Sequence, residues 1–247
     1  YVIMAMGVTP NTAIAGEAGL DLGATGGLVV NDRMETSDPF IYGAGDCVEV
    51  IHHVSQAPCH IPLGSLANRQ GRVVGNLLGG KADRFGPVLG SSAVKIFDWN
   101  VGTVGLTEGM AQQAGLDVAV TWASFSDKAD YYPESSNIHL KVIFNRETHA
   151  LLGLQAYGPG DVVKRADVFA SVLQRQGRLE DLLHLEFAYA PPYAPALDPL
   201  AVLAGAALNE VDDHILGAPP HTPFKEYVVL DLRQPKEAES RLLSAEQ

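Results

Sequence analysis

A single acidic residue follows a segment whose small side chains could let a flat ligand approach the backbone. In residues 36–46, a turn leads into the apolar strand step Ile41-Tyr42, then into three small residues ending at Gly45, and then into Asp46. Small residues permit close approach, and open α/β sheets bind ligands at the carboxyl ends of their strands. A carboxylate there suits the hydroxyls of a sugar or sugar alcohol. We therefore expect Asp46 to bind such a ligand; an ordinary strand with a capping aspartate is the alternative.

A helix is expected directly after Pro62. Its glycines at positions 64, 71 and 75 weaken a helix, so we expect them to permit close approach to a sheet or a ligand. The positive end of the helix, near residues 61–65, favours negative charge on a bound group. Apolar residues recur at helical spacing and form one stripe: Leu63, Leu66, Ala67, Val74, Leu77 and Leu78.

Two tyrosines stand on a proline-rich segment near the other end of the chain. Tyr189 and Tyr193 alternate with Pro191, Pro192 and Pro195, which stiffen the backbone. A rigid phenol can donate a hydrogen bond to a leaving thiolate or another sulfur anion. Packing at a subunit interface, where tyrosine is common, is the alternative role for both residues.

Cysteines and histidines cluster between positions 47 and 60. Cys47, His52, His53, Cys59 and His60 are residue types that bind zinc. Their spacing matches no common zinc motif, and adjacent histidines on a strand point to opposite sides. We therefore predict no metal site, and we expect Cys47 to be a buried small residue rather than a nucleophile.

Composition excludes several classes of partner. The chain has 247 residues, 47% of them hydrophobic, which suffices for one large or two modest domains. Its formal net charge of −12 repels nucleic acids and anionic membrane surfaces. No apolar run is long enough to span a bilayer. Two cysteines cannot form a disulfide framework, which indicates a reducing cytoplasm.

The amino-acid composition changes at residues 81–90, which predicts a domain boundary there. Before it we expect strands at residues 1–6, 28–30 and 40–42 and a small hairpin within residues 49–60. After it, strands and helices follow one another without strict alternation, which predicts an α+β unit with an antiparallel sheet. The expected strands are residues 93–97, 101–106, 117–123, 139–144 and 150–157, with a turn at 98–100 and helices starting near 107, 161 and 199.

Several motifs, in this order, resemble the pyridine nucleotide-disulfide oxidoreductases. Gly-x-x-Pro-Asn at residues 7–11 is similar to the segment that leaves the NAD(P)H domain of this family. Residues 27–30 and 36–46 look like the return into the FAD domain. Residues 66–72 resemble the helix that begins at the flavin, and residues 93–209 resemble the dimerisation domain. The resemblance thus implies that Asp46 binds the ribityl chain of FAD.

The same resemblance gives expectations for domains and cofactor contacts. Residues 1–11 would end the NAD(P)H-binding domain, 12–88 would be the C-terminal segment of the FAD-binding domain, and 89–216 would be the dimerisation domain. The implied fold is the C-terminal portion of a two-dinucleotide-domain flavoprotein, α/β and α+β. Flavin contacts implied by the resemblance are Gly45, Asp46, Pro62, Leu63 and Ala67.

Residues 185–199 are most similar to the coenzyme A-disulfide and persulfide reductase group. This implies a homodimeric enzyme that uses FAD and NAD(P)H to reduce coenzyme A disulfide, coenzyme A persulfide or polysulfide. Tyr189 and Tyr193 would reach across the dimer as catalytic residues. Residues 217–247 read as a linker and a strand similar to the start of rhodanese-like domains, which some members carry. NADH oxidase or peroxidase activity is the alternative within the family.

The sequence lacks a Gly-x-Gly-x-x-Gly phosphate-binding turn. Residues 43–45 and 158–160 have two glycines each but no third at the required offset. The chain also begins without Met, inside an apolar run. We therefore expect a fragment that lacks the redox cysteine of the family, and a dimerisation module without activity of its own is a further alternative.

Overall fold

A five-stranded antiparallel sheet forms the larger part of the computed structural model, which describes residues 1–212. The strand order is β3-β4-β7-β6-β5. Each strand alternates with its neighbour in direction, as the sequence pattern predicts. The bounds are β3 Ser92–Ile96, β4 Trp99–Gly105, β5 Val118–Ser126, β6 Asn137–Asn145 and β7 Leu151–Gly158.

The hairpin of β6 and β7 confirms the expected pairing around residues 145–148. The Asn145 side-chain oxygen accepts hydrogen bonds from the backbone of Glu147 and Thr148, which closes the turn. In contrast, the turn expected at residues 98–100 is wrong. Trp99 pairs with Ile96, so Phe97 and Asp98 form the turn, and Phe97 adopts a positive φ of 52°.

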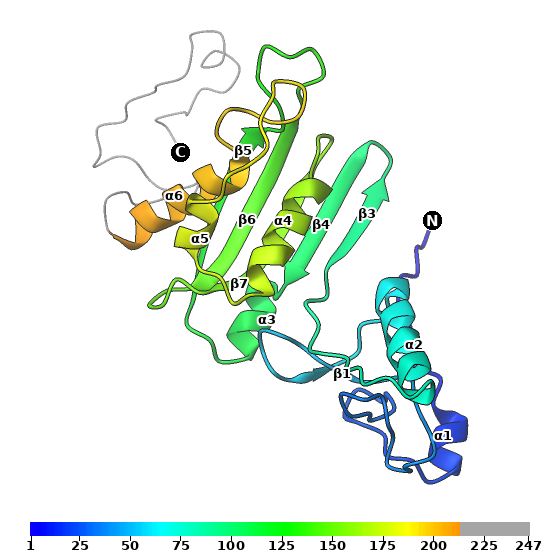
Figure 1. The fold of residues 1–247 in the computed structure, drawn as a ribbon. Helices are drawn as coiled ribbons and strands as arrows, with labels where there is room; N and C mark the ends of the chain where they lie inside the picture. Colours follow the sequence, from blue (N-terminus) through cyan, green and yellow to red (C-terminus); the bar gives the residue numbers. More distant parts are fainter. Residues whose placement is uncertain (213–247) are drawn as a thin grey trace. The chain divides into compact units, whose positions relative to one another are not determined.

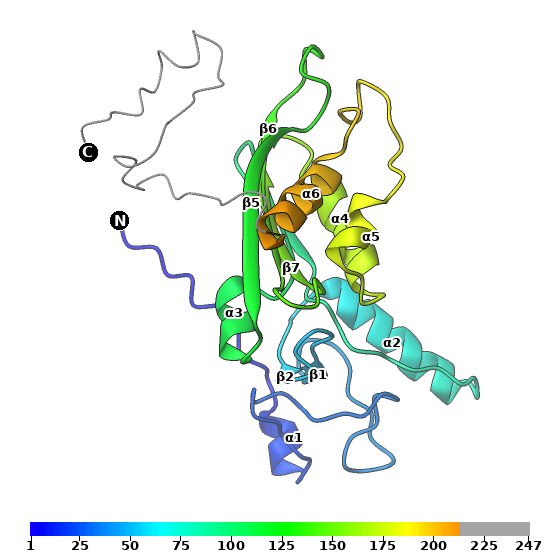
Figure 2. The ribbon, with the colours of Figure 1, turned by 90° about the vertical axis from the view of Figure 1, so that its left-hand side faces the viewer.

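Three helices lie on one face of this sheet (Figures 1 and 2). They are α4 (Val163–Leu173), α5 (Leu179–Leu183) and α6 (Pro199–Val211), and their apolar sides supply fully buried residues such as Phe169 and Leu203. The short helix α3 (Glu108–Gln113) contacts β5 and begins at Thr107, whose side chain accepts a hydrogen bond from the Met110 backbone, as expected.

The segment before residue 90 contains one long helix and otherwise only short elements. Its elements are α1 (Ala13–Glu17), the two-residue strands β1 (Val50–Ile51) and β2 (Pro58–Cys59), and α2 (Gly64–Leu78). The antiparallel pair β1–β2 confirms the expected hairpin. The helix after Pro62 is also confirmed. Mixed helices and antiparallel sheets thus confirm the predicted fold class.

Two expected strands in this segment are wrong. Residues 1–6 are exposed and form no strand, because no described segment pairs with them. Near residues 40–42, only Tyr42 makes a bridge, to Glu35, and Phe40 is 90% exposed in a turn. The expected strand at residues 28–30 reduces to isolated bridges at Leu28.

Helix α2 buries most of the expected stripe. Leu66 and Val73 are buried, and Leu63, Val74 and Leu77 pack against them, but Leu78 is 70% exposed. The glycines at positions 64, 71 and 75 have no atom of the described chain within 4 Å of a built Cβ. Their expected close approach to a sheet is therefore wrong for the described residues.

Among residues 1–212, helices of the length and apolarity needed to cross a bilayer do not occur. The expectations for residues 217–247 lie outside the described residues.

Candidate functional site

The bend before Asp46 is built by two glycines in different ways. A Cβ at Gly43 would lie 2.7 Å from a methyl group of Leu28, so this position lies directly against the core. Gly45 has a φ of +91°, which favours glycine, and a Cβ there would meet open space. Its backbone N–H donates to the side-chain oxygen of Gln70 on α2 at 2.7 Å. The bend is thus held against α2, with its Gly45 side open.

The Asp46 carboxylate is available to a ligand. Asp46 is exposed, and within the described chain no hydrogen bond or ion pair involves its carboxylate. Its backbone carbonyl accepts a hydrogen bond from His60 Nε2 at 2.7 Å, which fixes the backbone at this point. A fixed acceptor without a partner suits a polyol, as the sequence predicts.

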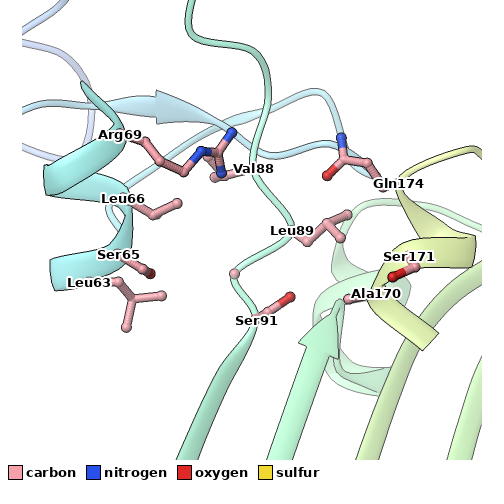
Figure 3. Close-up of a pocket in the computed structure, with 11 residues that line it drawn as sticks. Leu63, Ser65, Leu66, Arg69, Val88, Leu89, Ser91, Ala170, Ser171 and Gln174 are labelled. Atoms are coloured by element: carbon pink, nitrogen blue, oxygen red, sulfur yellow. The ribbon is translucent and has the colours of Figure 1, made fainter. Parts of the chain in front are cut away.

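The start of α2 lines a cavity of about 320 Å³. Leu63 precedes the helix in an extended conformation and gives no side-chain cap to the first backbone N–H groups. The lining residues come from the start of α2, from residues 88–91 and from α4 (Figure 3): Leu63, Ser65, Leu66, Arg69, Val88, Leu89, Gly90, Ser91, Ala170, Ser171 and Gln174. Pro62, Ala67 and Asp46 are not among the lining residues, so of the expected flavin contacts only Leu63 faces this cavity.

Both expected catalytic tyrosines line a second cavity, of about 590 Å³. Tyr189 and Tyr193 are 51% and 68% exposed, and Lys128 and Lys164 line the same cavity. The Lys164 ammonium donates to the Tyr193 carbonyl at 3.2 Å, which connects the tyrosine loop to the start of α4. Asp161 also lines the cavity, but the two ammonium groups and the phenols together still favour an anionic group.

A third tyrosine, Tyr131, joins the pair and was missed in the sequence. Its phenol interacts with the phenol of Tyr189. The pKa of Tyr131 lies above its ordinary value, because local desolvation and then the neighbouring Tyr189 phenol disfavour the phenolate. Tyr131 therefore stays a proton donor at neutral pH. The sequence Tyr131-Tyr132-Pro133 repeats the tyrosine–proline association of residues 189–195, and this signal could have identified it.

The cysteine and histidine cluster has a different character. Burial, and then the charge of Glu49, raise the pKa of Cys59 to about 11, so its thiol is protonated at neutral pH. His52 is buried, and desolvation lowers its pKa. In the part of the chain that the structure describes, no three side chains of the His, Cys, Asp or Glu types are placed to hold a metal ion. Cys47 is half-buried and packs against the core around Leu28.

Comparison with known protein families shows which family this chain belongs to. Residues 1–60 match the family description "Pyridine nucleotide-disulphide oxidoreductase", and residues 91–201 match "Pyridine nucleotide-disulphide oxidoreductase, dimerisation domain". The chain carries pyridine nucleotide-disulphide oxidoreductase domains.

Several oxidoreductases are similar to this chain in sequence or structure. The chain is 38% identical over 203 residues to the NAD(P)H sulfur oxidoreductase (CoA-dependent) of Pyrococcus furiosus, covering 82% of this chain and 46% of the relative. It is 37% identical over 212 residues to an NADH oxidase of Methanocaldococcus jannaschii, covering 86% and 47%. The structure of an NAD-dependent persulfide reductase from A. fulgidus is similar, with a TM-score of 0.84 and 40% identity, over 86% of this chain and 39% of that one. The oxidoreductase domains described here thus span about half the length of these curated relatives.

Proposed function

We propose that the full-length protein is an FAD-dependent, NAD(P)H-driven reductase of coenzyme A disulfide, coenzyme A persulfide or polysulfide. The observation that carries this proposal is a cavity of about 590 Å³ at which Tyr189 and Tyr193 meet Lys128 and Lys164. Tyr131 adds a third phenol next to Tyr189. The names of the Pyrococcus and A. fulgidus relatives support the same reaction class.

The residues around Asp46 fit one part of a flavin. The partnerless carboxylate would accept hydrogen bonds from ribityl hydroxyls, and the open side of Gly45 leaves room for the ligand. The uncapped first turn of α2, at Leu63 and beyond, would stabilise negative charge on the ring, with Pro62 and Ala67 flanking it. When bound, FAD would supply the transfer of electrons from NAD(P)H to the sulfur chemistry.

The tyrosine pair would act on the sulfur substrate. Cleavage of an S–S bond leaves negative charge on the departing sulfur, and a protonated phenol can stabilise that charge by donating a hydrogen bond. Because the phenols of Tyr131 and Tyr189 are neighbours that interact, one would orient the other. Tyr193 lines the cavity and its hydroxyl makes no hydrogen bond within residues 1–212, so we assign it to substrate contact.

Homodimer formation is part of the proposal. Residues 91–201 match a dimerisation domain, and large apolar side chains are exposed on the sheet, including Trp122 at 61% and Tyr157 at 49%. The exposed tyrosines would then complete the site of the partner subunit. Light scattering coupled to size exclusion tests this: a dimeric mass supports it, and a monomeric mass at micromolar concentration contradicts it.

The finer organisation is also proposed. Residues 1–11 would end an NAD(P)H-binding domain, 12–88 would belong to an FAD-binding domain and 89–216 would form the dimerisation domain. Residues 217–247 would be a linker and the start of a rhodanese-like domain, which the strand-like pattern of residues 227–235 supports. A cytoplasmic location is supported by the absence of disulfides among the described residues.

Substrate comparison in the flavin-loaded full-length protein tests the function. NAD(P)H consumption is measured with coenzyme A disulfide, with coenzyme A persulfide and with oxygen or peroxide as the acceptor. Faster turnover with the coenzyme A substrates supports the proposal. Turnover with oxygen or peroxide alone would instead support an NADH oxidase or peroxidase, the second candidate, which the Methanocaldococcus relative favours. Absence of bound flavin and of any turnover would favour a dimerisation module.

A further inference from the structure

A buried guanidinium connects the segments that carry the tyrosines. Arg165 lies in the first turn of α4 and is 1% exposed. Its Nε and Nη2 donate to one carboxylate oxygen of Asp198 at 3.2 and 3.0 Å. Asp198 is itself buried, and its other oxygen accepts the Leu200 backbone N–H at 3.0 Å, which caps α6. Residue 198 ends the loop that carries Tyr189.

The same guanidinium also bonds to two other segments. Its Nη2 donates to the Asp127 carbonyl at 2.9 Å, at the start of the loop that carries Tyr131. Its Nη1 donates to the Asp161 carbonyl at 2.9 Å, directly before α4. One side chain therefore holds residues 127–136, 158–161 and 188–198 together.

The Asp127 carboxylate closes the loop of Tyr131. It accepts the backbone N–H of Ser136 at 2.8 Å and of Asp161 at 2.9 Å, and it pairs with Lys128 at 2.9 Å. A Cβ at Gly160 would lie 2.7 Å from the Asp127 carboxyl carbon, so glycine is needed there. The sequence 158–160, which fails as a phosphate-binding turn, thus has a structural role at this network.

Net stabilisation alone does not explain a buried ion pair of this kind. Desolvation of two charges offsets much of their attraction, and apolar replacements of such pairs are often neutral or stabilising. A planar guanidinium that donates in fixed directions does, however, set the relative positions of its acceptors. The acceptors of Arg165 lie in the very segments that bear Tyr131 and Tyr189.

We propose that Arg165, together with Asp198 and Asp127, is a positioning residue that holds the loops of Tyr131 and Tyr189 so that the two phenols stay next to each other. The consequence for catalysis rests on the proposed function, whereas the consequence for the tyrosine pair does not. Arg165 itself acts only through the loops that it joins.

Three variants separate positioning from folding. Asp198→Asn keeps the size and the cap of Leu200 but removes the charge that faces Arg165. Arg165→Met removes the guanidinium and keeps an apolar stem. Leu173→Ala is the matched control, because Leu173 is 1% exposed in the same helix and has no bond to either tyrosine loop.

The first measurement needs no enzyme activity. Tyrosine labelled with ¹³C at Cζ is titrated by NMR in the intact chain, with the Tyr131 signal assigned by its loss in Tyr131→Phe. We expect Asp198→Asn and Arg165→Met to lower the Tyr131 pKa toward its ordinary value, as Tyr189→Phe does. The Leu173→Ala control should retain the wild-type titration even though it is destabilised.

The second measurement uses the flavin-loaded full-length protein. Misplacement of a reacting group by about 1 Å can lower a rate about 100-fold, so we expect coenzyme A disulfide turnover to fall about 10- to 100-fold in both network variants. Ferricyanide reduction by NAD(P)H, which needs no phenol, should stay within about twofold, as the Leu173→Ala control does in both assays.

A wild-type Tyr131 titration in folded Asp198→Asn would overturn the inference. If Arg165→Met does not fold, Asp198→Asn and Arg165→Lys decide it by the same signal. If the wild-type protein reduces no coenzyme A substrate, the proposed function fails, and the NMR titration still decides the positioning role.

Discussion

Replacement of Asp46 by alanine separates flavin binding from folding. The carboxylate is exposed and has no partner within the described chain, so its removal should change the free energy of unfolding by no more than about 0.5 kcal/mol. A hydrogen bond to a charged group contributes about 1.5–3 kcal/mol. Loss of that bond to a ribityl hydroxyl should raise the Kd of FAD about 10- to 150-fold, since about 1.4 kcal/mol is tenfold.

The assay is a titration of the deflavinated full-length protein with FAD, followed by quenching of flavin fluorescence. Asp46→Asn keeps a neutral acceptor oxygen and should give an intermediate Kd. Asp167→Ala, another exposed carboxylate without a described partner, is the matched control and should bind FAD as the wild type does. A Kd for Asp46→Ala within about threefold of the wild-type value would refute the reasoning, because that change is below the contribution of one such bond.

Four further predictions concern stability and reactivity. Gly71→Ala should raise the free energy of unfolding of this chain by about 0.5–1 kcal/mol in urea denaturation, because a Cβ there meets open space on a helix; a lower stability would contradict this. Gly160→Ala should lower it by about 1–3 kcal/mol, because its Cβ would overlap Asp127, and an unchanged midpoint would show that the loop yields freely. Burial raises the pKa of Asp127, but the hydrogen bonds from Lys128 and from the backbone outweigh burial, so the pKa lies below its ordinary value. The contribution of Asp127 to the free energy of unfolding should therefore be fully present above about pH 5 and be lost as the pH falls through 3.8 and below. Asp127→Asn should show a flatter pH profile of the free energy of unfolding in this range. At pH 8, Cys59 should react with iodoacetamide about 100-fold more slowly than a cysteine of ordinary pKa, as followed by mass spectrometry, and equal rates would contradict its raised pKa of about 11.

Regular alternation made much of the sheet predictable. The β6–β7 hairpin and the strand β5 follow from alternating apolar residues and a clear Asn-containing turn. The cap of α6 at Asp198 was also readable, because aspartate before proline is a strong helix start. Residues 1–6 were mispredicted because apolar composition alone forms no strand without a hydrogen-bonding neighbour.

The site was predictable only where one segment supplied it. Tyr189 and Tyr193 were predicted as site residues from a single proline-rich loop, and both line one cavity in the structure, but their catalytic role stays a prediction. Tyr131 comes from a different loop, and its interaction with Tyr189 depends on tertiary packing that local sequence does not encode. The pair Arg165–Asp198 joins residues 33 positions apart, and a buried arginine looks in sequence like any exposed helix arginine.

The account depends most on the tyrosine pair as the group that acts on the sulfur substrate. The decisive measurement is the rate of NAD(P)H consumption with coenzyme A disulfide or persulfide in full-length wild type, Tyr131→Phe, Tyr189→Phe and the double variant. We predict turnover in the wild type, a loss of about tenfold or more in each single variant, and little further loss in the double variant, because the two phenols act as a unit. Wild-type turnover that both single variants retain in full would contradict the account.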